Sequence, residues 1–392
     1  MAKCLAAAVL VFCFFFPANR IFAYEYAANI GLGVTEQYND NILLTQSNKE
    51  GDFVTFITPS IDLGIKSLGS SLRVGYSPSF SFYSSHDENN STSQHLNADG
   101  ILGISERTTF AVNETYIRSQ EITDIVNISN FGPISKLVDR QYNNVSGTLT
   151  QNIRNDLTLT AGGSYNIIDY KDPQFNNLTA YSGVLGLAYK PSDRMTLALN
   201  AVYTVYDFSQ NSESTTQQYT LGIQYKLLPT LTMGMTGGAV ITEIKDSGGS
   251  DIGFAGGIDL TQTFEKGSAT VYFKQSVVPD TENGEPVTAQ TVGGGISRPF
   301  SEKSTSFVSA SYTKYKSAVS GGGVNQDSIY VNGGLDYKVA KWADLSLAYS
   351  YIKSNDKEIN PRNYVNNIIA LTLKVHYGKE PQSWSQTKEA LR

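Results

Sequence analysis

The sequence predicts an all-β protein, a transmembrane antiparallel β-barrel of about 16 to 18 strands with 18 as the best count. Short segments of alternating polarity fill most of the chain, and their connectors alternate between tight turns and long polar loops. Since successive side chains of a strand point to opposite faces, one face can meet lipid and the other a lumen. In one such segment the two faces read Leu72, Val74, Tyr76, Pro78, Phe80 and Phe82 against Arg73, Gly75, Ser77, Ser79, Ser81 and Tyr83.

The first 23 residues have the features of a secretory signal peptide. Lys3 precedes an unbroken apolar run from Cys4 to Phe16, and Ala23 is a small residue at the expected cleavage point. The run is shorter than the about 20 apolar residues that span a bilayer as a helix. We therefore expect a leader at 1–23, a barrel at 24–377, a periplasmic tail at 378–392, and export to the bacterial outer membrane.

Composition excludes several kinds of site. Both cysteines, Cys4 and Cys13, lie in the leader, so the mature chain has no thiol for a disulfide, a nucleophile or a metal site. The mature chain carries 28 basic and 36 acidic residues, a net charge of −8, which argues against binding to nucleic acid. The histidines, His86, His95 and His376, are far apart in sequence. We therefore expect no metal and no cofactor.

Eighteen strands are predicted from the alternation of polarity. The first nine lie at 27–37, 53–65, 70–84, 94–105, 107–118, 139–152, 156–169, 178–190 and 194–208. The second nine lie at 216–227, 230–244, 251–264, 268–278, 288–299, 304–316, 326–339, 342–353 and 364–377. An even number of strands returns the end of the last strand to the side on which the first begins.

The connectors predict the orientation of the barrel. Short connectors, expected at the periplasmic rim, lie at 67–69, 106, 154–156, 191–193, 229, 265–267, 301–303 and 341. Long connectors, expected to face outward from the cell, lie at 39–52, 85–90, 119–138, 171–176, 209–214, 245–250, 279–286, 317–323 and 355–362.

The last predicted strand supports closure of the barrel. Its outward positions alternate cleanly and finish on an aromatic residue, which resembles a barrel-assembly signal: Ile369, Leu371, Leu373, Val375 and Tyr377. An open sheet edge in hydrocarbon would leave backbone N–H and C=O groups unpaired at several kcal/mol each. The first and last strands are therefore expected to pair.

The inner face is predicted to be polar and weakly charged. Strand parity assigns to it Thr220, Gly222, Gln224, Gly253, Gly257, Asp259, Thr270, Tyr272, Lys274, Asn332, Gly334, Asp336 and Lys338. Such a lining suits neutral hydrophilic solutes better than one strongly selected ion, and its tyrosines could stack on sugar rings. The alternative is that tyrosines fill space or form an interfacial girdle. We expect an interfacial girdle to include the tyrosines that strand parity assigns to the lipid face: Tyr76, Tyr189, Tyr203, Tyr225, Tyr337 and Tyr349.

Charged residues on the inner face are candidates for setting selectivity at a constriction. The candidates are Arg73, Asp99, Asp259, Lys274, Asp336 and Lys338. The alternative is that opposite charges simply pair across neighbouring strands.

The longest predicted loop, 119–138, is unusually apolar for a solvated connector. Its apolar residues are Ile122, Ile125, Val126, Ile128, Phe131, Ile134, Leu137 and Val138. Exposed apolar clusters normally cover or bind something. This loop either folds inward as a constriction or lid, as in general porins, or packs on neighbouring loops.

A short stretch near the start of the barrel carries a resemblance to a known family. Residues 35–44 read Thr-Glu-Gln-Tyr-Asn-Asp-Asn-Ile-Leu-Leu, with the Tyr-x-Asp-Asn element at Tyr38, Asp40 and Asn41, and Pro59-Ser60-Ile61-Asp62-Leu63 follows. The stretch resembles the type 2 β-barrel porins and related outer-membrane barrels of exopolysaccharide systems. The resemblance covers about 35 residues and implies an outer-membrane pore, with polysaccharide export as its setting.

The sequence thus favours a passive hydrophilic pore, not an enzyme. One alternative is a barrel that sheathes a partner such as a multihaem cytochrome in an electron conduit. Another is an outer-membrane lipid hydrolase, since His86 and His95 flank one outer loop. The expected partners are outer-membrane lipid and lipopolysaccharide, the barrel-assembly machinery and periplasmic components of polysaccharide export.

Overall fold

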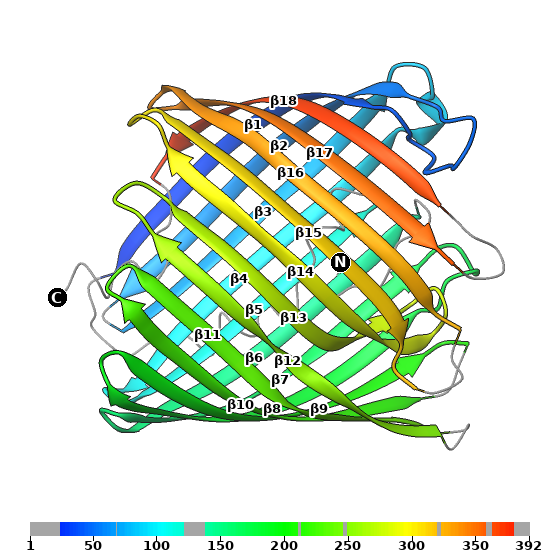
Figure 1. The fold of residues 1–392 in the computed structure, drawn as a ribbon. Coiled ribbons are helices and arrows are strands. Elements are labelled where there is room, and N and C mark those ends of the chain that lie inside the picture. The colour runs from blue at the N-terminus through cyan, green and yellow to red at the C-terminus, as the bar shows by residue number, and fades with distance from the viewer. Residues whose placement is uncertain are drawn as a thin grey trace.

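The computed structural model describes residues 24–67, 69–120, 138–210, 213–245, 249–319, 323–357 and 363–379. These residues form one closed antiparallel β-barrel of eighteen strands (Figure 1). The predicted fold class and strand number are confirmed. The expected leader at 1–23, most of the 119–138 loop and nearly all of the expected tail lie outside the described residues.

The strands are long and of similar length. The first half contains β1 (Glu25–Asn39), β2 (Asp52–Ser67), β3 (Ser70–Tyr83), β4 (Ser91–Ser105), β5 (Thr108–Ser119), β6 (Arg140–Arg154), β7 (Leu157–Tyr170), β8 (Leu178–Ser192) and β9 (Met195–Phe208). The second half contains β10 (Ser214–Leu228), β11 (Leu231–Ile244), β12 (Gly249–Thr263), β13 (Ser268–Asp280), β14 (Glu285–Pro299), β15 (Ser304–Ser317), β16 (Asn325–Ala340), β17 (Ala343–Asp356) and β18 (Tyr364–Gly378). One short 3₁₀ helix, η1 (Asp87–Asn89), lies between β3 and β4.

Each strand pairs with its neighbours in the sequence, and β18 pairs with β1. The closing ladder runs from the pair Asn29–Gly378 to the pair Asn39–Ile368. It places Thr35 opposite Thr372, whose hydroxyl oxygens lie 2.8 Å apart. The expected pairing of the first and last strands is therefore confirmed.

The two rims of the barrel differ. One rim, called here the short-turn rim, carries the tight connections and both the start of β1 and the end of β18. The other, called here the loop rim, carries the longer connections, including the first loop (40–51) and the β7–β8 loop (171–177). Among the described residues, no helix is long and apolar enough to span a membrane.

One predicted loop of the loop rim is shorter in the structure than expected. The sequence placed a long connector at 279–286, but β13 continues to Asp280, β14 begins at Glu285, and only the tip (281–284) joins them. The misleading signal is the two prolines, Pro279 and Pro286, which lie directly opposite each other in the ladder. Since proline has no N–H, this pair fits a non-hydrogen-bonded position, where each nitrogen points away from the other strand.

The two faces of the wall have the composition that strand parity predicts. The outer face is apolar, and Ile252, Leu221 and Leu185 expose 71%, 67% and 61% of their surface. Tyrosines flank this belt on the same face, for example Tyr165 and Tyr181, whose ring centroids lie 5.1 Å apart. Such a belt with aromatic residues at its edges fits a bilayer.

Candidate functional site: the barrel interior

The inner wall is lined by hydroxyl groups that pair across neighbouring strands. Examples are Thr58 with Ser79 at 2.8 Å and Ser182 with Thr204 at 3.0 Å. The same arrangement recurs around the barrel in the pairs Thr35–Thr372, Ser81–Ser91, Ser93–Ser119, Thr261–Thr270 and Thr291–Thr313. Because hydroxyl groups are polar and uncharged, these pairs make the wall hydrophilic without adding charge.

The charged candidates lie on this inner face, in three separate places. Arg73 and Asp99 are directly opposite each other on β3 and β4. Asp259 and Lys274 lie on β12 and β13, opposite Tyr272 and Gly257. The third place is on β16, where Asp336 lies opposite Ser346 and Lys338 lies opposite Asp344. All six lie in the middle of the wall or nearer the short-turn rim.

The contacts of these residues differ. The guanidinium of Arg73 binds Asp62, with Nη2 2.9 Å from Oδ1, and Asp336 accepts a 2.6 Å hydrogen bond from Ser346. Arg73 thus fits the alternative of pairing across neighbouring strands. Among the described residues, Lys274 and Asp259 have neither an ion pair nor a hydrogen bond through their side chains. Whether any of the six sets selectivity stays a prediction.

The first loop (40–51) folds onto the inner face near the loop rim. Ile42 packs against the inward-facing Val54, Tyr83 and Phe56 of β2 and β3. Leu44 packs on the opposite flank against inward-facing side chains of β16, β17 and β18, namely Tyr330, Ile352, Tyr364 and Ile368. Leu44 adopts φ 54°, an unfavourable value for a leucine, so this packing holds it in a strained backbone conformation.

Polar contacts fix the same loop to β18. Asn41 is fully buried, and its side chain donates to the carbonyl oxygens of Thr45 at 2.8 Å and Val365 at 3.0 Å. Asp40 accepts hydrogen bonds from both the backbone and the side chain of Asn367, at 2.7 and 2.6 Å. Tyr38 instead faces outward and packs on Phe53, with ring centroids 5.0 Å apart. Two residues of the family-like motif therefore anchor an inward loop.

His86 supports the first loop from the side of β3. Its Nδ1 lies 3.1 Å from Asp52 Oδ2, and its Nε2 lies 3.0 Å from Glu50 Oε2. The hydrogen bond to Asp52 raises the pKa of His86, and the hydrogen bond to Glu50 adds to this. Burial acts in the opposite direction but is outweighed. Both ring nitrogens bind carboxylates, so neither is free to take a proton from a nucleophile. This geometry does not favour the hydrolase alternative at His86.

The tip of β13 and β14 reaches across the mouth of the barrel. The backbone N–H of Asn176, in the β7–β8 loop, donates to the carbonyl oxygen of Thr281 at 2.8 Å. The hydroxyls of Tyr170 and Thr281 lie 2.6 Å apart, and Phe175 stacks on Tyr170 with a centroid distance of 5.0 Å. Since β9 to β12 lie between β8 and β13 along the wall, this cross-mouth contact narrows the opening.

An ion-pair cluster lies beside the β7–β8 loop. Asp139 binds Arg118, with Nη2 3.2 Å from Oδ2, and also binds Lys171. Burial favours the neutral form of Asp139, but the hydrogen bonds from Arg118 and Lys171 hold its pKa below the ordinary value. The cluster fixes the start of the β7–β8 loop to the end of β5.

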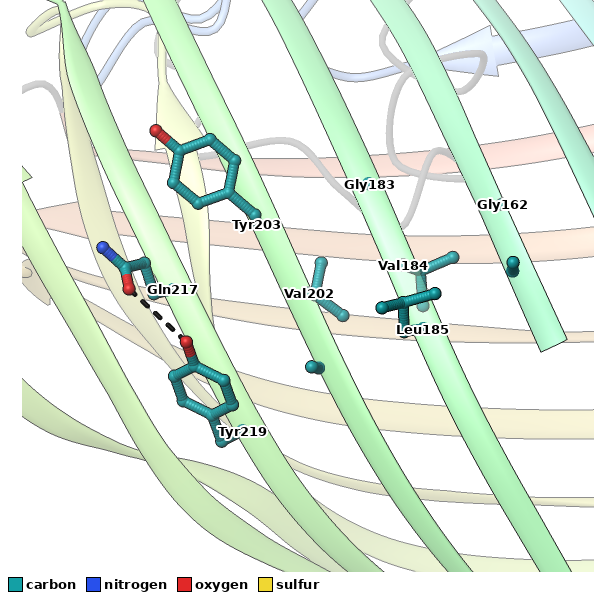
Figure 2. A pocket seen from close by; sticks show the side chains of 10 residues that line it. Gly162, Gly183, Val184, Leu185, Val202, Tyr203, Gln217 and Tyr219 are labelled. Carbon is teal, nitrogen blue, oxygen red and sulfur yellow. Dashed lines mark hydrogen bonds between the residues drawn. The ribbon is translucent and has the colours of Figure 1, made fainter. Parts of the chain in front are cut away.

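A shallow depression of about 380 Å³ lies in the wall formed by β7 to β10 (Figure 2). Gly162, Gly183 and Ala201 contribute little side chain there, while Tyr203 and Tyr219 flank it on the outer face. The hydroxyl of Tyr219 donates to Gln217 over 3.5 Å. Because its outer edge lies in the apolar belt, an acyl chain of the bilayer suits it better than a hydrophilic solute.

Sequence reasoning missed both inward segments. The first loop contains three consecutive apolar residues, Ile42, Leu43 and Leu44, in a connector predicted to face outward from the cell. That run was the available signal. No local pattern predicts the cross-mouth contact, because its partners lie more than a hundred residues apart. The two alternatives for the 119–138 loop, folding inward or packing on neighbouring loops, concern residues that lie mostly outside the described part of the chain.

Comparison with known proteins supports the fold alone. No family model matches the chain, and no curated protein matches it in sequence. Solved structures do match. Acinetobacter baumannii OccAB4 has a TM-score of 0.51 at 11% identity, covering 90% of this chain and 98% of that one. Pseudomonas aeruginosa OccK2 (OpdF) has a TM-score of 0.50 at 10% identity, covering 90% and 98%.

A third solved structure, Pseudomonas aeruginosa OpdK with vanillate, has a TM-score of 0.50 at 10% identity, covering 90% of this chain and 99% of that one. At these identities a shared substrate does not follow from a shared fold. The chain therefore has the fold of outer-membrane porins. The exopolysaccharide-linked subtype that the resemblance implies stays a prediction.

Proposed function

We propose that this protein is a passive pore of the outer membrane that admits small hydrophilic solutes. The short-turn rim faces the periplasm and the loop rim faces outward, as in other barrels with this distribution of turns and loops. The first loop and the cross-mouth contact restrict the path at the outer end. No catalytic residue is needed for such diffusion.

The observation that carries the proposal is the contrast between the two faces of one closed wall. The outer face presents an apolar belt, while the inner face presents paired hydroxyls and few charges. The ladder between β1 and β18 closes the barrel, so neither strand leaves an unpaired edge in the lipid. An inner face of this kind supports diffusion of neutral polar solutes better than selection of one ion.

Single-channel conductance of the refolded barrel in planar bilayers tests the pore. Neutral oligosaccharides of graded length, added to either side, should block the current up to a limiting size that reports the width of the constriction. A folded barrel that never conducts would contradict the proposal and favour the sheath alternative. Ser47→Ala, in an exposed part of the first loop, is the matched control for variants that loosen the constriction.

We further propose polysaccharide export as the setting, on the resemblance at residues 35–63. A polymer would require the first loop and the tip to move aside, because both occupy the mouth. Block by long oligosaccharides from the periplasmic side alone would support export. Permeation restricted to short sugars from both sides would contradict it. The proposed partners are lipid and lipopolysaccharide, the barrel-assembly machinery and periplasmic export components.

A further inference from the structure

The wall is incompletely paired at one place, between β12 and β13. Their ladder runs only from the pair Gly256–Gln275 to the pair Thr263–Ser268. By contrast, β12 pairs with β11 up to Gly249, and β13 pairs with β14 up to Asp280. Residues 249–255 of β12 and 276–280 of β13 therefore have a partner on one side only. These two segments, called here the seam, diverge toward the loop rim (Figure 1).

The cross-mouth contact accounts for the missing ladder pairs between β12 and β13. Thr281 follows directly on the end of β13, which there pairs with β14 alone, and is bound across the mouth to Asn176 and Tyr170, beyond β9 to β12. Inside the barrel, Val278 and Val287 pack with Ala289 and Val324. The end of β13 is thus held away from β12 by contacts with other parts of the barrel.

The backbone at the seam is adapted to separation. Gly256, the last paired residue of β12, has φ +156°, and a Cβ there would lie 2.3 Å from the carbonyl oxygen of Thr236. The freed carbonyl of Phe254 accepts a 2.8 Å hydrogen bond from Gln275 Nε2, and the N–H of Ile252 binds Asp251. Pro279 has no N–H to leave unpaired. Side chains thus replace part of the missing ladder.

The seam also has the chemistry of a binding site. On its outer side, Ile252 and Phe254 are exposed and apolar, while on its inner side Gly253 is small. One pair below the split, Lys274 faces the lumen opposite Gly257, exposed and without an ion pair among the described residues. Strand alternation directs the N–H groups of Phe254 and Val277 into the seam. A cation, and N–H donors directed into the seam, at the edge of an apolar surface suit an oxyanion with a hydrocarbon tail.

We propose that the seam is a lateral port through which an anionic amphiphile with a single acyl chain passes between the lumen and the outer leaflet. Lys274 holds the anionic head at the inner end, and the tail lies against Ile252 and Phe254 in the lipid. Unpaired backbone groups in hydrocarbon cost several kcal/mol each, so a seam held open requires groups that satisfy them. This port goes beyond the proposed pore and uses a different exit.

The open state of the seam is tested first by cysteine pairs, since the described residues contain no cysteine. If the register continued, Ala255 would lie opposite Ser276. In the matched control, Thr261 and Thr270 are paired and their hydroxyls are 3.1 Å apart. Under mild oxidation T261C/T270C should form a disulfide and A255C/S276C should not. Equal disulfide formation in both pairs would show that β12 and β13 are paired beyond Gly256 and would overturn the proposal.

The ligand is tested with a dodecanoate that carries a diazirine at its tail, photolysed on the barrel in nanodiscs and mapped by mass spectrometry. Label should concentrate at residues 252–255 and 275–279 and fall about fivefold or more in Lys274→Gln, which removes a charged partner. Lys338→Gln, another inward-facing lysine, should leave the pattern unchanged. Label spread evenly over the outer wall would overturn the port.

Conductance measured on the same preparations separates the two proposals. A barrel that conducts but shows no specific label at the seam retains the pore and loses the port. A folded barrel that does not conduct but takes label at the seam loses the pore and retains the port.

Discussion

The first loop and the tip of β13 and β14 both narrow the mouth, yet they are held in opposite ways. The first loop is anchored to the strands beside it, through Asn41 to β18 and through Ile42 to β2 and β3. The ladders on both sides of β1 stay complete up to Asn39. The tip is anchored across the mouth, through Thr281 to Tyr170, and the ladder beside it is broken.

The difference teaches that an inward segment leaves the wall intact only when its anchors lie on neighbouring strands. An anchor on the far side of the mouth draws the strand end with it, and the lost ladder bonds must be replaced by side chains such as Gln275. We therefore expect the first loop to behave as a fixed part of the barrel. The tip should exchange between a position bound across the mouth and a released position.

Replacing Asn41 by alanine should have the largest effect, because it removes the fixed anchor. The side chain is fully buried, and its loss leaves the carbonyl of Val365 and the N–H of Thr45 without their partners. We expect the free energy of unfolding to fall by about 3 kcal/mol, measured by urea unfolding in micelles, and conductance to rise. Ser47→Ala should change stability by less than about 0.5 kcal/mol. Equal unfolding midpoints for the two variants would contradict a local anchor.

Replacing Gly256 by alanine should disturb the bend at the base of the seam. A Cβ at this position meets the carbonyl of Thr236 at 2.3 Å and requires a backbone conformation rare for L-residues. The expected loss is about 2 kcal/mol of unfolding free energy. Gly183→Ala is the matched control, since its Cβ would have open space around it. If both substitutions are tolerated alike, the bend does not depend on glycine.

Replacing Tyr170 by phenylalanine should release the tip while leaving the first loop in place. It removes the hydroxyl that lies 2.6 Å from Thr281 and keeps the ring that stacks on Phe175. The loss of the hydrogen bond to Thr281, about 1 kcal/mol, corresponds to an about fivefold increase in the population of the released tip. Single-channel recordings should show that increase as more frequent openings. Tyr203→Phe, on the outer face, should open as often as the unchanged protein.

Much of the wall could be predicted from sequence, because polarity with period two reports directly on which face each side chain takes. Asp259 and Asp336 fall on the face that parity gave them, and Ile369 and Leu371 fall on the other. The mouth could not be predicted in this way. The packing of Leu44 on Ile352 and the bond from Asn176 to Thr281 join segments that are distant in sequence. Pro279 and Pro286 were misleading, because proline is common in loops but also occurs at strand positions whose N–H would not pair.

A rise in pH should weaken the first loop, the smallest of these effects. The pKa of His86 is raised, chiefly by its hydrogen bond to Asp52 and further by Glu50 in the first loop. A group with a raised pKa contributes its stabilisation in full below its unfolded pKa of about 6.5 and loses it as pH rises through the higher folded value. Hydrogen-exchange protection at Ile42 and Ser85, corrected for intrinsic rates, should therefore fall as pH rises from about 6.5. The protection should become independent of pH in His86→Gln, and protection at Tyr203, in the middle of β9, should not change in either protein. A fall of equal size at Ile42 in His86→Gln would mean that another group causes it, which would contradict a local anchor of the first loop at His86.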